Sequence, residues 1–317
     1  MNSEKASASR MENIIIGAGA VGIGLAVMLS KVSNTYLVTR PNDGTLKSVH
    51  TFSLKGAVEL SSSTIQLTST DNLQQLPLES VIWIAVKAYD LEDVLQTVSS
   101  LPPRPIVILS NGLNLATSAR EQLGERWNII RACVHTGLQK DEPAVVKITN
   151  TMHLSVATFP ESMILMQDYF NTLCATDLAP YLKIVEEETI AICEWKKVIV
   201  NATLNPLCML VDGQNDSVLT LPSLTNLTKK LFAEVKSVAN HEGFSFKDFS
   251  FEVFCTGIEK YGNNVNNTVV DFRRGRRSDL EYTLGRIISL ARIYGIEVPT
   301  AEVIQQVCQA LEDKNCA

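Results

Sequence analysis

The chain has 317 residues, which is more than one small core requires and predicts two domains of roughly 100–200 residues each. A net charge of −6 provides no bulk attraction to nucleic acid or to an anionic membrane surface, so we expect neither as a partner. The seven cysteines and four histidines are scattered and form no CxxC motif. The sequence therefore indicates neither a disulfide framework nor a metal site.

The N-terminal region favours a cytoplasmic protein over a secreted one. A signal peptide could use Lys5 and Arg10, followed by the apolar run from Ile14 to Leu29. However, glycines interrupt that run, no A-x-A-like cleavage site closes it, and it is shorter than the ~20 apolar residues of a membrane helix. We therefore expect residues 1–10 to be a disordered extension of a cytoplasmic protein.

A glycine-rich turn is the first motif with functional meaning. The run Asn13–Ile16 predicts a strand, and helical spacing follows at Leu25, Ala26 and Leu29. Between them, GAGAVG has the G-x-G-x-x-G pattern, in which glycines permit a tight turn, a close approach to a pyrophosphate and packing of the helix on the strand. A turn without a ligand is the alternative. The predicted cofactor contacts are the residues of this turn: Gly17, Ala18, Gly19, Ala20, Val21 and Gly22.

The residue after the second predicted strand indicates which dinucleotide is bound. Thr35–Thr39 reads as a strand, and Arg40 follows it. At this point NAD enzymes usually place an acid that holds the ribose 2′-hydroxyl, whereas an arginine accommodates a 2′-phosphate. Arg40 therefore favours NADP(H). Asp43 lies nearby in the sequence, and a surface arginine without a ligand is the alternative interpretation.

Two further apolar runs end in polar residues. SVIWIAVKAYD is broken by Lys87, and PIVILSNGLN is broken by Asn111. Ligands of open parallel sheets bind outside the carboxyl ends of the strands, so both side chains are expected near the nicotinamide and the substrate. The alternative is that they simply mark strand ends. His135, after the predicted strand IIRACV, is interpreted as a loop histidine without chemistry.

From about Thr189 onward, helical periodicity replaces the strand-like runs. We expect a dinucleotide-binding α/β domain over residues 11–188, an all-α domain over residues 189–317, and an active site in the cleft between them. Gly295 and Pro299 mark the end of one helix and the start of the next. The expected helices span residues 221–241, 251–261, 280–294 and 300–311.

The apolar segment EWKKVIVNATLNPLCMLV carries polar residues at intervals of four: Lys197, Asn201 and Asn205. At ~100° per residue such a step drifts by only ~40°, so these side chains form one polar stripe on a helix that is otherwise apolar. A stripe facing the crevice would present the Lys197 ammonium to a substrate carbonyl, where hydride transfer builds negative charge. The alternative is a surface lysine with two asparagines that cap or bend the helix.

Taken in order, these motifs resemble the ketopantoate reductase family over nearly the whole chain from Met11. The shared segments are GAGAVG, the strand-end arginine, VKAYD, SNGLN, EWKKVIVNATLNPL, DFRRGRRSDLEYTLG and GIEVP. The resemblance implies a Rossmann-like domain followed by a helical domain similar to the C-terminal domain of 6-phosphogluconate dehydrogenase. It also implies NADPH-dependent reduction of 2-dehydropantoate, a small 2-oxo acid, to pantoate for pantothenate biosynthesis, and a homodimer is compatible with it.

The resemblance also assigns roles to individual residues. It makes Lys197 the general acid and Asn201 and Asn205 substrate contacts. It places cofactor and substrate contacts at Lys87 and Asn111, and it makes Asp279 the carboxylate that holds the substrate hydroxyl.

The chain departs from the family pattern on the substrate side. The family usually has Thr-Glu where this chain has Ser278-Asp279, and a serine-rich segment where it has Asn266-Asn267-Thr268. Asn267 can still donate to a substrate carboxylate. These departures leave reduction of another 2-oxo or 3-hydroxy acid as the alternative activity. A non-catalytic NADP(H)-binding sensor is the alternative outside the enzymes.

Overall fold

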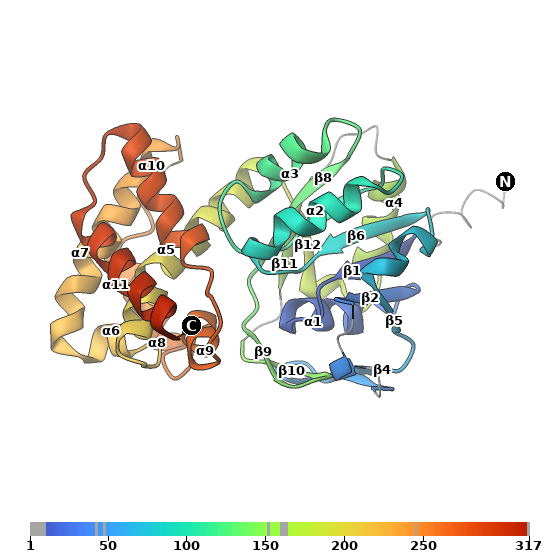
Figure 1. Ribbon diagram of the computed structural model, residues 1–317, viewed down its shortest axis with the longest axis horizontal. Helices are drawn as coiled ribbons and strands as arrows, with labels where there is room; N and C mark the ends of the chain where they lie inside the picture. The colour runs from blue at the N-terminus through green and yellow to red at the C-terminus, as the bar shows by residue number, and fades with distance from the viewer. Residues whose placement is uncertain are drawn as a thin grey trace. The chain divides into compact units, whose positions relative to one another are not determined.

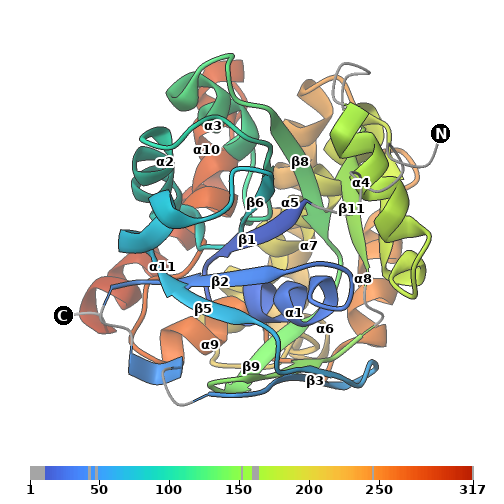
Figure 2. The same ribbon diagram turned by 90° about the vertical axis from the view of Figure 1, so that its right-hand side faces the viewer.

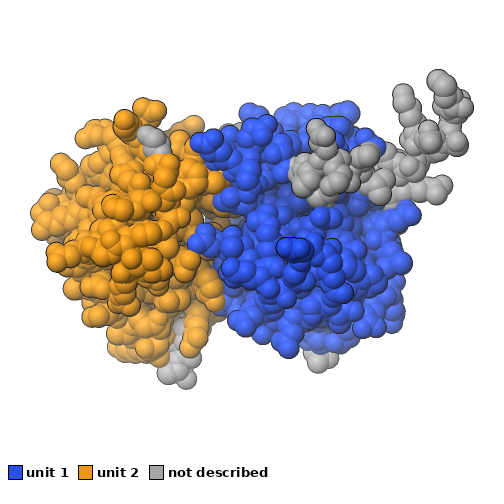
Figure 3. All heavy atoms as spheres, turned by 90° about the horizontal axis from the view of Figure 1, so that it is seen from above, with its two compact units in different colours: residues 1–110, 114–190 blue, residues 111–113, 191–317 orange. Residues whose placement is uncertain are grey.

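The protein is described by a computed structural model that divides into two units (Figures 1 and 3). Unit 1 comprises residues 1–110 and 114–190, and unit 2 comprises residues 111–113 and 191–317. The expected disordered extension, residues 1–10, lies outside the described residues. The structure describes residues 11–41, 44–46, 49–150, 153–158, 164–244 and 246–315.

An eight-stranded sheet forms the centre of unit 1, with the strand order β12-β11-β8-β7-β6-β1-β2-β5. The six strands from β5 to β8 are parallel and follow the Rossmann order, whereas β11 pairs antiparallel with β8. The order of the parallel strands reverses between β1 and β6, which makes this pair the switch point. The strands are β1 (Glu12–Ile16), β2 (Thr35–Thr39), β5 (Gln66–Ser69), β6 (Ser80–Ile84), β7 (Ile106–Ile108), β8 (Ile129–Val134), β11 (Leu154–Ala157) and β12 (Leu182–Val185).

The sheet is covered on both faces, which explains its nearly continuous apolar strands. In β1, Ile15 joins the core formed with α1 (Ala20–Leu29) and α4 (Ile164–Cys174). Its neighbours Ile14 and Ile16 point to the opposite face. That face carries two helices, α2 (Leu91–Ser99) and α3 (Leu115–Leu123), and Figure 2 shows these on the other side of the strands from α1 and α4.

A second, four-stranded sheet packs beside α1 and was not predicted from the sequence. Its central pair joins Ser53 to Val145, so it depends on residues far apart in the chain that no local pattern connects. Gly24 of α1 lies against Leu54 and Leu138 of this sheet. The strands run in the order β4-β3-β10-β9, with β3 (Phe52–Gly56), β4 (Leu60–Ser62), β9 (Leu138–Glu142) and β10 (Val145–Ile148). Short 3₁₀ turns in unit 1 are η2 (Gly44–Leu46), η3 (Thr70–Gln75), η4 (Ala88–Asp90) and η5 (Ala179–Tyr181).

Among the described residues after β12, the regular elements are all helices. The long helix α5 is buried on nearly every side from Ala202 to Met209, and it shares the core of unit 2 with the helices that follow it. No helix in the described part of the chain has the length and apolarity needed to cross a membrane. The helices are α5 (Glu187–Leu210), α6 (Ser217–Thr220), α7 (Pro222–His241), α8 (Phe251–Lys260), α9 (Asn267–Arg273), α10 (Arg286–Tyr294) and α11 (Pro299–Asn315).

The predicted fold class, an α/β domain followed by a helical domain, is confirmed. One predicted helix is wrong in detail, because residues 280–294 do not form a single α-helix. They begin with a π-helical turn, η6 (Glu281–Gly285), before α10. Gly295 ends α10 in the left-handed conformation at φ +65°, and α11 starts at Pro299 as predicted.

A buried polar network joins β1 to α4. The fully buried Asn13 accepts hydrogen bonds on Oδ1 from Trp83 Nε1 at 3.0 Å and from the Tyr169 hydroxyl, and its Nδ2 donates to Ser33 Oγ at 2.7 Å. Asn13→Leu should lower the free energy of unfolding by about 2–4 kcal/mol, because it leaves two buried donors without an acceptor. Urea unfolding followed by circular dichroism measures this loss.

Asn34→Ala provides the matched control for this substitution. Asn34 Nδ2 donates to Glu12 Oε1 at 2.9 Å in an exposed position, where water replaces a lost partner. We expect this change to alter the free energy of unfolding by less than ~0.5 kcal/mol. Equal losses for the two variants would contradict the network's contribution.

Candidate active site

The glycine-rich turn connects β1 to α1 at the switch point of the sheet. Gly17 has φ +112°, and a Cβ there would lie 2.7 Å from the carbonyl oxygen of Ala85, which follows the paired strand β6. A Cβ on Gly22 would lie 1.8 Å from the Gly17 carbonyl oxygen. Glycine is therefore required at both positions. A Cβ on Gly19 would meet no atom within 4 Å, so there is open space beside this residue.

The first turn of α1 suits an anionic ligand. Gly19 is the N-cap and supplies no side-chain cap, and the first turn contains no acidic residue. Backbone N–H groups at a helix N-terminus attract phosphate under these conditions. Lys140 adds a positive charge, because its Nζ donates to the Ala18 carbonyl at 3.0 Å. Sequence reasoning missed Lys140, since it lies on β9 of the unpredicted sheet.

Arg40 follows β2 directly, as the sequence predicts. Its side chain is 76% exposed, and its Nη2 lies 2.8 Å from Asp90 Oδ2 at the end of η4. An exposed ion pair contributes only about 0–1 kcal/mol, so a phosphate can compete for this guanidinium. Asp43, the acid near Arg40 in the sequence, lies outside the described residues.

Lys87 and Asn111 follow two neighbouring strands of the sheet at their carboxyl ends, as the sequence predicts. β6 ends at Ile84 and β7 at Ile108, so each side chain is carried by the loop after its strand, and each is half-buried. The strands are parallel neighbours, and the Ser110 hydroxyl donates to the Val86 carbonyl at 2.7 Å. That bond joins the loop after β6 to the loop after β7. Asn111 itself groups with unit 2.

The polar stripe lies on α5 as predicted. Lys197 and Asn201 are half-buried and Asn205 is only 9% exposed, so burial increases along the stripe. Lys196, by contrast, is exposed. The rest of this stretch is apolar and buried, at Trp195, Val198, Ile199 and Ala202. The helix thus turns Lys197, and not its neighbour, toward the protein.

Asp279 is buried in unit 2, with 8% of its surface exposed. Its backbone carbonyl accepts from the Tyr282 N–H and the Thr283 hydroxyl, both at 3.1 Å. The π-helical turn η6 follows, closed by the bond from Gly285 N to Leu280 O at 3.0 Å. Such turns are rare and occur frequently at functional sites. This π-helical turn could not be predicted, because the spacing of its apolar residues also fits an α-helix.

In the segment 266–268, the side chains are divided between structural and exposed positions. Asn266 is the N-cap of α9, since its Oδ1 accepts from Val269 N at 3.2 Å. Thr268 is buried. Asn267 is the exposed residue of the three and the first residue of the helix.

His135 has structural partners, in line with its interpretation as a loop histidine. Its Nε2 lies 3.0 Å from Ser155 Oγ, and its backbone N–H donates to the carbonyl of His153. The His153 carbonyl also accepts a hydrogen bond from the Thr136 hydroxyl at 3.3 Å. Burial lowers the pKa of the His153 imidazole. The six cysteines in the described part of the chain are free thiols, and no cluster of three potential metal ligands occurs there.

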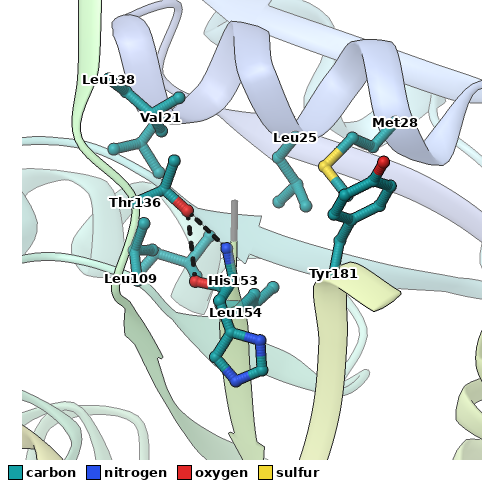
Figure 4. Close-up of a pocket in the computed structure, with 10 residues that line it drawn as sticks. Val21, Leu25, Met28, Leu109, Thr136, Leu138, His153, Leu154 and Tyr181 are labelled. Carbon is teal, nitrogen blue, oxygen red and sulfur yellow. Dashed lines mark hydrogen bonds between the residues drawn. The ribbon is translucent and has the colours of Figure 1, made fainter. Parts of the chain in front are cut away.

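A small pocket in unit 1 lies next to His153, and it is shown in Figure 4. Its volume of about 30 Å³ holds a few waters at most and is far too small for a dinucleotide. Apolar side chains of α1 form much of its wall, so we interpret it as a packing gap. The side chains from α1 are Val21, Leu25 and Met28, and Tyr181 closes the far side.

The fold and the glycine-rich turn place the chain among Rossmann-type proteins with a helical C-terminal domain. The profile of the family described as ketopantoate reductase PanE/ApbA matches residues 14–161, and the profile of its C-terminal domain matches residues 190–312. The chain therefore belongs to the ketopantoate reductase family, a family of oxidoreductases. The resemblance indicated by the sequence motifs is confirmed.

Relatives from several sources share the full length of the chain. The 2-dehydropantoate 2-reductase of Pyrococcus horikoshii is 23% identical over 304 residues, which cover 95% of this chain and 98% of that protein. A PanE/ApbA family ketopantoate reductase from Ralstonia eutropha JMP134 has a TM-score of 0.84 at 19% identity, covering 97% of this chain and 100% of its own. D-Mandelate dehydrogenase, solved with NADH and anilino(oxo)acetate, has a TM-score of 0.80 at 19% identity, covering 96% and 99%. At these identities the structural likenesses establish the fold.

Gly22 and Gly19 of the turn should respond differently to alanine. Gly22→Ala should lower the free energy of unfolding by at least ~2 kcal/mol, because its Cβ cannot fit beside the Gly17 carbonyl. Gly19→Ala should leave it within ~1 kcal/mol, because Gly19 has an ordinary φ of −78° and open space around it. Thermal and urea unfolding of both variants measure this contrast. A large loss in Gly19→Ala would show that the space beside it is needed for packing.

Proposed function

We propose that the protein catalyses the NADPH-dependent reduction of 2-dehydropantoate to pantoate, with Lys197 as the general acid. The observation that carries the proposal is the polar stripe of Lys197, Asn201 and Asn205 on α5, where the interleaved Trp195, Val198, Ile199 and Ala202 are apolar and buried. Amine and amide groups donate hydrogen bonds, so three of them in line along one side of a helix suit the carbonyl and carboxylate oxygens of a 2-oxo acid. Membership of the ketopantoate reductase family supports the same reaction.

Each proposed site residue has its own role in the reaction. Bound NADPH supplies the hydride to the carbonyl carbon of the substrate. Lys197 donates a proton to the carbonyl oxygen, where negative charge develops, and a positioned acid of this kind contributes ~10²–10⁴-fold to the rate. Asn201, Asn205 and Asn267 hold the polar groups of the substrate, and Asp279 accepts a hydrogen bond from its hydroxyl.

The cofactor would be held by unit 1. The N–H groups at the start of α1 take the pyrophosphate, and Gly19 leaves it room to approach. Arg40 takes the 2′-phosphate in exchange for Asp90. Lys87 and Asn111, in the loops after β6 and β7, contact the nicotinamide half, where Asn111 also meets the substrate.

A different 2-oxo acid is the second candidate substrate. Asp279 has a side chain one methylene shorter than the glutamate usual in the family, which leaves more room beside the substrate. D-Mandelate dehydrogenase, which has a similar fold, was solved with anilino(oxo)acetate, and this supports another acid as a candidate. NADPH oxidation measured with a panel of 2-oxo acids tests the proposal. A clear preference for another acid would contradict 2-dehydropantoate as the substrate and would favour the second candidate. Absence of turnover with every acid would favour a non-catalytic sensor.

Arg40→Ala should weaken NADPH binding by roughly 10- to 100-fold, because it removes charge-assisted hydrogen bonds to the 2′-phosphate. NADH binding should change little, since NADH lacks this phosphate. Calorimetry with both cofactors measures the difference. Arg126→Ala provides the control, because Arg126 is an exposed arginine bonded to the Ser99 carbonyl. Equal losses of NADPH and NADH affinity would contradict the assignment of Arg40.

Lys197→Ala should reduce kcat by at least ~10²-fold, as expected for the loss of a positioned acid. NADPH affinity should stay within a few-fold of wild type, because the glycine-rich turn and Arg40 are unchanged. Steady-state kinetics and cofactor titration measure both quantities. Lys196→Ala, one residue away on the exposed side of α5, should have little effect. A greater loss in Lys196→Ala would mean that the stripe does not face the substrate.

A further inference from the structure

Glu312 is a buried carboxylate with no role in the reaction proposed above. It lies near the end of α11, and only 7% of its surface is exposed. Removing a carboxylate from water costs several kcal/mol unless hydrogen bonds satisfy it. Its Oε1 accepts two such bonds from one residue, from Ser278 N at 3.1 Å and from the Ser278 hydroxyl.

The residue that Glu312 holds comes directly before Asp279. The Ser278 hydroxyl also accepts from Leu280 N at 3.3 Å, so the bonds of this serine bracket Asp279 in the chain. On the other side, the Asp279 carbonyl is held by Tyr282 N and the Thr283 hydroxyl in the π-helical turn. The backbone of Asp279 is therefore fixed both before and after it.

The same face of α11 also contacts α5. Cys308 lies one helical turn before Glu312, and its Sγ is 3.8 Å from the carbonyl oxygen of Pro206, the residue after Asn205. Burial, followed by the charge of Glu312, raises the pKa of the Cys308 thiol to about 12, so the thiol stays protonated and can donate. One turn of α11 thus contacts the neighbours of two proposed substrate residues.

We propose that Glu312 is a positioning residue that sets the location of the Asp279 carboxylate through Ser278, and so determines preference for 2-oxo acids that carry a hydroxyl. The proposal rests on the function proposed above. An aspartate has one fewer rotatable bond than the glutamate usual at this place, so its carboxylate cannot adjust to a shifted backbone. The position of the Asp279 carboxylate then depends on the hydrogen bonds that hold Ser278 in place.

The test compares two substrates that differ only in the hydroxyl, 2-dehydropantoate and 3,3-dimethyl-2-oxobutanoate. Glu312→Met removes the acceptor at similar volume, and it should reduce kcat/KM for 2-dehydropantoate by roughly tenfold or more. The same variant should lose no more than about threefold on the analogue, which makes no bond to Asp279. Glu312→Gln keeps the acceptor and should stay within about threefold of wild type on both.

Two further variants separate positioning from a general loss of structure. Asp313→Ala alters the exposed neighbour on α11 and should leave both substrates unaffected. Ser278→Ala removes only the hydroxyl donor, so it should reproduce the substrate-selective loss to a smaller extent even if Glu312→Met does not fold. Circular dichroism checks that each variant is folded.

A double-mutant cycle measures whether Glu312 acts through Asp279. Once Asp279→Ala has removed the carboxylate, adding Glu312→Met should cause no further selective loss on 2-dehydropantoate. Equal losses on both substrates, or an undiminished loss in the Asp279→Ala background, would overturn the positioning role while leaving the proposed function intact. Failure of the wild-type protein to reduce 2-dehydropantoate would overturn the proposed function, and this inference with it.

Discussion

The contact between Gly22 and the carbonyl of Gly17 is the constraint on which unit 1 depends. A Cβ at Gly22 would lie 1.8 Å from that oxygen, so α1 can start within a few residues of β1 only because no side chain is present. This close start places α1 on the sheet face that buries Ile15. It also leaves the N-terminus of the helix at the switch point between β1 and β6, where a dinucleotide binds in folds of this order. The packing of α1 on the sheet and the place where a dinucleotide can bind thus both require that residue 22 has no side chain.

In unit 2, the burial of apolar side chains determines how α5 is oriented. A helix surrounded by apolar side chains admits polar ones only where something compensates their loss of water. Lys197 and Asn201 are half-buried and Asn205 is buried, whereas the neighbouring Lys196 is exposed and does not belong to the stripe. The apolar core therefore fixes the rotation of the helix, and this rotation turns Lys197, rather than Lys196, toward the protein.

Much of this could be predicted from sequence because it depends on local patterns. The strands Thr35–Thr39 and Ile129–Val134 have the predicted limits, since continuous apolar runs are typical of parallel strands covered on both faces. The stripe on α5 follows from helical spacing alone. The second sheet could not be predicted, because it pairs Ser53 with Val145. Likewise, Lys140 and Glu312 act on residues distant in the chain, so only the folded structure reveals their partners.

The proposed mechanism assigns proton donation and substrate preference to different elements of unit 2. Lys197, the proposed proton donor, lies on a helix that is held by the core of unit 2. Asp279 lies between a hydrogen-bonded serine and a π-helical turn, where a change of one methylene can be accommodated without moving α5. A substitution at Asp279 or Glu312 is therefore expected to change substrate preference, while Lys197, the proposed proton donor, stays in place. Variation among relatives that act on different acids is therefore expected to concentrate in the segment around Asp279 and in the part of α11 that holds it.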